Sequence, residues 1–138
     1  MLNQQATILL YDAMLSELNN QMTDNSMDTR LLQKYSSDEV SKVHHKYAQE
    51  EEMIQNEINQ LDDKSGSEYK ELMAELKELR DEEDKEVERI EEKNSDAENA
   101  KSVENESLEV RAEAIRADRD ALKEAMQKEI EDEFGYFQ

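Results

Sequence analysis

The chain of 138 residues contains no cysteine, no proline and no tryptophan, and its only glycines are Gly66 and Gly135. Without cysteine it can form neither disulfides nor thiolate sites, and its redox compartment stays undetermined. Two glycines cannot build a loop that cradles phosphate. The absence of proline leaves long helices uninterrupted. These absences favour a helical protein and exclude thiol-dependent and glycine-loop sites.

Large apolar side chains are also scarce. Aromatic residues make up 5% of the chain, the mean hydropathy is −1.09, and charged residues reach 39%. The length suits a single domain, but this composition is poor material for a compact core and is typical of coiled coils or long helices. Disorder is the alternative for a chain of low hydrophobicity and high net charge. The regular apolar spacing argues against disorder for most of the chain.

The net charge is −20. Such a charge repels nucleic-acid phosphates and anionic membrane surfaces, so we expect no nucleic-acid partner. The longest apolar run of the N-terminal region, Ile8–Tyr11, is too short to cross a bilayer, and no transmembrane span is predicted. The start of the chain has no basic region of the kind that opens a cleavable signal peptide. The expectation is a protein that is cytoplasmic, virion-associated or exported without a cleaved signal.

Residues 1–22 form an almost uncharged segment that is predicted to be a helix. Its apolar residues recur three and four positions apart and cover a wide arc of the helix. A helix that is apolar over much of its circumference is usually buried on several sides. In so short a chain, some of those sides are expected to face other copies. The predicted self-association residues of this segment are Ile8, Leu9, Tyr11, Leu15, Leu18 and Met22.

Residues 23–35 are predicted to be a connector, because their Thr-Asp-Asn-Ser cluster favours a turn or a cap. Residues 36–138 then form an acidic helical hairpin or coiled coil, with a turn near 62–67 at the sequence Asp-Asp-Lys-Ser-Gly-Ser. Ser-x-x-Glu sequences, which can cap helices, begin at Ser36, Ser65 and Ser95. The last of them predicts a break near 94–96, and one uninterrupted helix is the alternative.

Two apolar stripes define the predicted packing of this hairpin. The seam residues follow heptad-like spacing and are Tyr47, Ile54, Ile58, Leu61, Leu72, Leu76 and Leu79. A C-terminal stripe is predicted to join the N-terminal segment in self-association, through Leu122, Met126, Ile130, Phe134 and Phe137. The fold class is therefore all-α, with long helices in a hairpin or bundle completed by oligomerisation. A three- or four-helix bundle within one chain is the alternative.

The sequence offers little catalytic or metal-binding chemistry. Its only histidines, His44 and His45, are adjacent on a predicted helix, and adjacent residues point about 100° apart, so they cannot converge on one ion. Neither a zinc-protease motif nor a di-iron motif is present. The runs Glu50–Glu52 and Asp81–Asp84 fit a solvated helix face better than a calcium loop. We expect no catalytic, metal or cofactor residue, and not an enzyme.

These patterns predict a structural subunit that assembles with itself, and with other structural proteins, through its N- and C-terminal helices. A filament, a secretion appendage or a virus particle would use such a subunit. In layout the sequence resembles the subunits of type III secretion needles, filaments and flagella, and the resemblance implies terminal helices packed together in a tube. The alternative is an acidic helical assembly chaperone, scaffold or adaptor that binds a partner protein. A third reading is an acidic decoy that imitates DNA.

Overall fold

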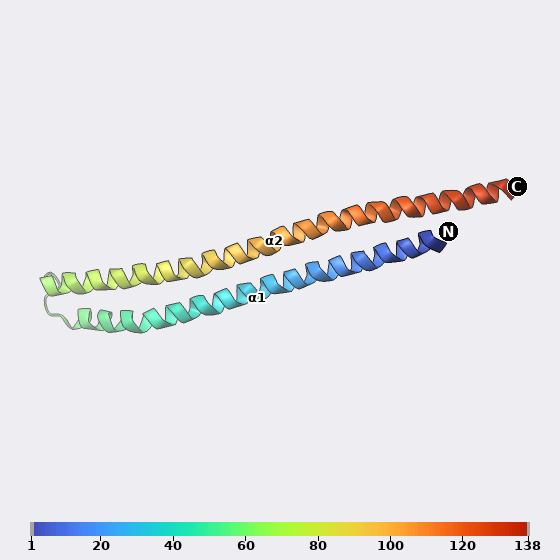
Figure 1. Cartoon of the computed structure of the whole chain (residues 1–138). Helices are drawn as coiled ribbons and strands as arrows, with labels where there is room; N and C mark the ends of the chain where they lie inside the picture. The colour runs from blue at the N-terminus through green and yellow to red at the C-terminus, as the bar shows by residue number, and fades with distance from the viewer. Residues whose placement is uncertain (1, 138) are drawn as a thin grey trace. The chain divides into compact units, whose positions relative to one another are not determined.

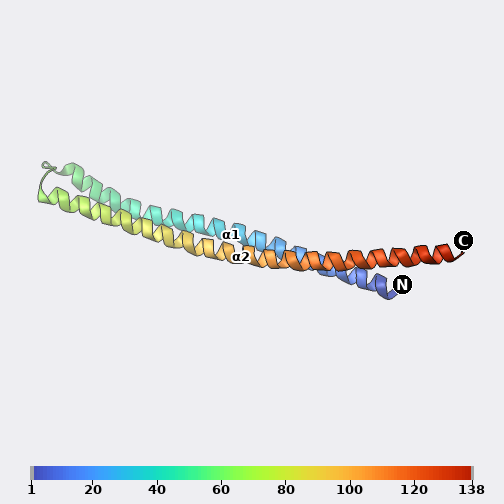
Figure 2. The same ribbon diagram turned by 90° about the horizontal axis from the view of Figure 1, so that it is seen from above.

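The fold is an all-α helical hairpin (Figure 1). The computed structural model describes the backbone of residues 2–137 and the side chains of residues 3–135. Helix α1 runs from Leu2 to Gln60 and helix α2 from Ser67 to Phe137, and no strand occurs within the described backbone. The two helices run in opposite directions and pack against each other (Figures 1 and 2).

Both expected interruptions of the helices are corrected by the structure. Residues 23–35 lie inside α1 and residues 94–96 lie inside α2. The hydroxyls of Thr23 and Ser26 donate hydrogen bonds of 2.9 and 3.0 Å to the carbonyls four residues earlier, those of Asn19 and Met22. Hydroxyls bonded in this way are satisfied within a continuous helix. They therefore do not cap a new one, and the N-terminal segment is the first part of a hairpin arm.

The chain leaves the helical conformation between Gln60 and Ser67. The Asp63 carboxylate accepts hydrogen bonds from the Ser65 hydroxyl at 2.7 Å and the Ser65 amide at 2.9 Å. These bonds, with one from the Gly66 amide, lower the pKa of Asp63. The first turn of α2 is closed by the amide of Lys70, which donates to the Gly66 carbonyl at 3.2 Å. Asp63, rather than a Ser65 capping box, therefore shapes the turn.

The hairpin consists of two units, each made of one segment of α1 and one of α2. Unit 1 contains Met1–Thr29 and Asn99–Gln138, and unit 2 contains Arg30–Glu98. The core of unit 1 is a cluster of Leu18, Leu108 and Ala112, with Leu15, Met22 and Ile115 packed against it.

Unit 2 has its core along the predicted seam. Tyr47, Ile58 and Leu76 are buried there, and Ile54, Leu61, Leu72 and Leu79 are half-buried. Val43 is buried with them. Among the described side chains of the whole chain, no large one is completely buried. A two-helix seam covers only one side of each helix, so the core is one layer thick.

Candidate interaction surface

Three residues that the sequence assigns to self-association are used within the chain. Leu15, Leu18 and Met22 belong to or pack against the core of unit 1. They face α2 because the apolar stripe of α1 continues along the inner side of a single helix. The sequence assigned this stripe to other copies, whereas the structure places it against α2 of the same chain.

The other predicted self-association residues divide into two groups. Ile8, Tyr11 and Leu122 are half-buried and Met126 is buried. Leu9 and Phe134 remain largely exposed, at 69% and 68%, and Ile130 is 38% exposed. The side chain of Phe137 lies outside the described ones. A smaller set than predicted therefore stays free for contacts with another molecule.

Exposed large apolar side chains are unevenly distributed between the two units. Each unit spans 69 residues, yet among the described side chains, those of residues 3–135, eight of these belong to unit 1 and four to unit 2. Those of unit 2 are Leu31, Tyr35, Met53 and Met73. Those of unit 1 are Leu9, Leu10, Met14, Met27, Val103, Val110, Ile130 and Phe134. Unit 1 thus leaves twice as many large apolar side chains in water.

One flank of unit 1 is hollowed between the helices. Two hollows, of about 430 and 500 Å³, lie along it. Both helices line them, with Thr7, Met14 and Gln21 from α1 and Ala114, Ala121 and Ala125 from α2. Thr7 and Met14 are seven residues apart, as are Ala114 and Ala121, so the hollows follow one another on the same flank. We name this flank of unit 1 the alanine groove.

The opposite flank of unit 1 is occupied by charges that are already paired. Arg119 binds Asp12 at 3.1 Å and Asp120 at 3.2 Å, and Arg116 binds Glu109 at 3.2 Å. The bonds to Asp12 and Asp120 raise the pKa of Arg119 further above its usual value. In the sequence, Asp12 comes directly after the seam residue Tyr11. Thr7 and Met14, which line the alanine groove, come directly before the seam residues Ile8 and Leu15, so they lie on the other side of α1. The two flanks of unit 1 therefore differ in kind.

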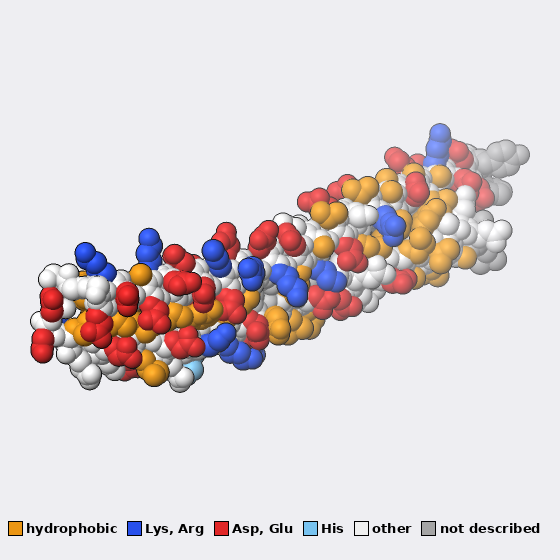
Figure 3. Space-filling view, turned by 60° about the vertical axis from the view of Figure 1, so that its left-hand side comes forward, with side chains coloured by type: hydrophobic (Ala, Val, Ile, Leu, Met, Phe, Trp, Pro, Cys, Tyr) orange, Lys and Arg blue, Asp and Glu red, His pale blue; other side chains and the backbone are white. Residues whose placement is uncertain are grey.

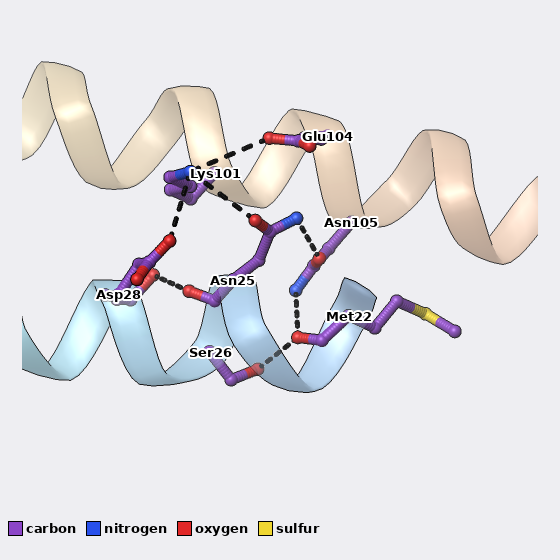
Figure 4. Close-up of polar contacts among 8 residues, drawn as sticks. Met22, Asn25, Ser26, Asp28, Lys101, Glu104 and Asn105 are labelled. Atoms are coloured by element: carbon purple, nitrogen blue, oxygen red, sulfur yellow. Dashed lines mark hydrogen bonds and ion pairs between the residues drawn. The ribbon is translucent and has the colours of Figure 1, made fainter. Parts of the chain in front are cut away.

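A polar layer crosses the apolar seam of unit 1 (Figure 4). Asn25 is only 6% exposed, and its amide donates to the side-chain oxygen of Asn105 at 2.9 Å. The Asn105 amide donates to the Met22 carbonyl at 3.5 Å, and Lys101 lies 3.4 Å from Asp28. Buried amides that satisfy each other favour one alignment of two helices over others. The sequence reading missed this layer because it placed Asn25 in a connector.

Unit 2 has a polar layer of a different kind. The imidazole Nδ1 of His44 lies 2.7 Å from a carboxylate oxygen of Glu83, and this bond lowers the pKa of Glu83. The neighbouring Glu83 carboxylate, together with burial, raises the pKa of Glu51. The pKa values of the two carboxyls are therefore shifted in opposite directions, and Glu51 keeps its proton to a higher pH than Glu83 does. Nearby, the bond to Glu86, burial and adjacent carboxylates raise the pKa of the buried Tyr47 to about 12.

The surface of unit 2 is dominated by charge. It carries 22 acidic and 11 basic residues, against 15 and 6 in unit 1. A hollow of about 430 Å³ is lined by five glutamates, Glu50, Glu57, Glu75, Glu78 and Glu82. Figure 3 shows acidic side chains crowded over the part of the molecule near the turn. A surface of this kind does not favour the approach of another acidic chain.

Among the described residues, no three acidic, histidine or cysteine side chains are placed to hold a metal ion. Neither described helix has a stretch that is long and apolar enough to cross a membrane.

Comparison with protein-family models, with curated proteins and with solved structures gives no match for this chain.

Proposed function

We propose that this chain is a non-enzymatic structural subunit that assembles with other copies of itself through its N- and C-terminal helical segments. Those segments form unit 1. The subunit would serve in a larger protein assembly, and unit 2 would remain a solvated acidic arm.

The observation that carries the proposal is the unequal exposure of apolar side chains in the two units. Unit 1 keeps eight large apolar side chains in water, twice as many as unit 2 in the same number of residues. Exposed apolar side chains that gather in one part of a protein are a feature of interaction surfaces. The segment Met1–Thr29 contains four acidic and no basic residues, so most of its side chains are uncharged and can take part in apolar or amide contacts.

The alternative is an acidic assembly chaperone or adaptor. The charge of unit 2 and its exposed Met53 and Met73 favour this function, because methionine packs adaptably against varied partners. The two functions differ in what the pure protein does. A structural subunit forms large homo-oligomers by itself, whereas a chaperone stays small until its partner is present.

A matched pair of variants tests the proposal. Leu10 in unit 1 and Leu31 in unit 2 both lie on α1 and are 59% and 63% exposed. Sedimentation velocity of the pure protein over a wide concentration range should show assembly that Leu10→Glu reduces at least tenfold. Leu31→Glu should leave it nearly unchanged, because the same charge is added to a surface outside the interface. A wild-type protein that stays monomeric at high concentration would refute the proposal.

A further inference from the structure

We infer that the alanine groove of unit 1 is the surface that receives a second copy of this chain, which lays a helix of its own unit 1 into the groove. This inference rests on the proposed self-assembly and specifies which flank of unit 1 performs it.

The geometry of the groove suits a helix. On the α2 side the groove is lined by the small side chains of Ala114, Ala121 and Ala125, and on the α1 side the larger apolar side chain of Met14 lines it. Small side chains allow the backbone of another helix to approach closely. The lining residues recur three and four positions apart, which is the spacing that lets side chains of a third helix interlock with two others in a left-handed bundle.

Charge favours a second copy here over the hollow of unit 2 that is lined by glutamates. Copies that each carry a net charge of −20 repel each other unless the meeting surfaces are nearly neutral. Only three charged side chains line the groove: Glu17, Asp118 and Arg111. In a two-fold arrangement the Arg111 of each copy can meet an acid of the other. The Arg119–Asp12 pair occupies the opposite flank of unit 1, and one hollow of unit 2 presents five glutamates. A second hollow of unit 2, of about 280 Å³, has Glu39 and Lys93 as its charged lining residues and is smaller than either hollow of the groove.

The exposed area is large enough for such a contact. The chain exposes 10602 Å², whereas a compact monomer of 16.2 kDa is expected to expose about 7,500 Å². This surplus of about 3,100 Å² is spread over the whole chain, and an ordinary stable interface would take roughly 800 Å² from each partner. A second copy in the groove would also cover Met14, which lines it.

The test compares two identical substitutions on one helix. Ala121 lines the groove, and Ala117, about one turn away, is exposed and lines neither hollow. Ala121→Glu should raise the dissociation constant of the homo-oligomer at least tenfold in sedimentation equilibrium. Ala117→Glu, which changes the net charge equally, should leave it within twofold. Circular dichroism of both variants checks that the hairpin is retained.

The absence of cysteine makes a second measurement simple. A single cysteine at position 121, introduced as Ala121→Cys, should be cross-linked between copies by a short bis-maleimide, and Ala117→Cys should not.

Each outcome of the sedimentation test is decisive. If wild-type protein assembles and Ala121→Glu behaves like Ala117→Glu, the groove is not the interface, although self-assembly stands. If wild-type protein never assembles, both proposals fail. If Ala121→Glu alone is impaired, the groove is the interface.

Discussion

Units 1 and 2 have the same length and the same two-helix construction, but they differ in what lies beside the seam. Unit 2 surrounds its seam with 33 charged residues, whereas unit 1 has 21 and a flank lined by alanines. A seam one layer thick leaves the sides of both helices uncovered in each unit. Charged side chains cover those sides in unit 2, whereas in unit 1 small apolar side chains line one of them, where we propose that a second copy binds. The same two-helix construction can therefore carry two different kinds of surface.

Truncating one core leucine in each unit should give the largest effects. Leu18→Ala and Leu76→Ala each remove a buried side chain and should lower the free energy of unfolding by about 2–5 kcal/mol. Urea titrations followed by circular dichroism measure this. Because Leu18 also borders the alanine groove, Leu18→Ala alone should weaken self-association. Equal weakening by Leu76→Ala would show that the two units do not differ as described.

The asparagine layer of unit 1 should respond differently to single and double substitution. Asn105→Leu leaves the amide of Asn25 buried without its partner, and we expect a loss of about 1–3 kcal/mol. The double variant Asn25→Leu/Asn105→Leu should recover most of this loss, because two leucines restore an apolar seam. Thermal unfolding of the three proteins forms the test. If the double variant were as unstable as the single variant, the two amides would depend on neighbouring groups and not mainly on each other.

The two glutamates of the unit 2 layer should shift stability in opposite directions with pH. Bonding to Glu83 raises the pKa of Glu51, so the folded state prefers neutral Glu51, and Glu51→Gln should raise the melting temperature by a few degrees at pH 7. This gain should shrink as the pH falls and wild-type Glu51 becomes protonated.

Glu83 is the matched control. The bond from His44 lowers the pKa of Glu83, so its charged form contributes stability above its ordinary pKa and loses it below. Glu83→Gln should therefore lower the melting temperature at pH 7 and make little difference at pH 3. Shifts of the same sign for both variants would contradict the opposite pKa shifts of Glu51 and Glu83.

The turn should show the smallest effect. Asp63→Ala removes the acceptor of the two Ser65 hydrogen bonds, so a slightly lower melting temperature is expected at pH 7. The pKa of Asp63 is lowered by these bonds, so the difference should fade as the pH drops below its ordinary pKa. Since the turn belongs to unit 2, self-association should be unaffected. A change in oligomer size would place the turn near the interface.

The sequence predicted the fold class because long helices follow from local spacing. The seam of unit 2 could be read from heptads such as Tyr47, Ile54 and Leu61, which all lie at buried or half-buried positions. Asp-Asp-Lys-Ser-Gly-Ser marks the point where the chain turns, since no other segment combines glycine with several turn-forming residues.

Other features depend on which segment lies opposite, and the local sequence does not encode that. The polar cluster near Asn25 resembled a turn, whereas the partner Asn105, 80 residues away, makes it part of a continuous helix. For the same reason the stripe containing Leu18 was assigned to other copies, although α2 of the same chain covers it. The alanine groove could not be found from apolar spacing, because alanine contributes little to such a stripe.

The pairing of Asn25 with Asn105 also bears on how the hairpin finds its alignment as it folds. Heptad stripes look alike every seven residues, so two such helices could slide past each other by one repeat with little loss of apolar contact. A slip of one repeat would set Asn25 opposite Ala112 in one direction, where its amide would lose its partner, and opposite Glu98 in the other. Among these three alignments two amides face each other only in the observed one, so the layer stabilises that alignment over a slip toward Ala112.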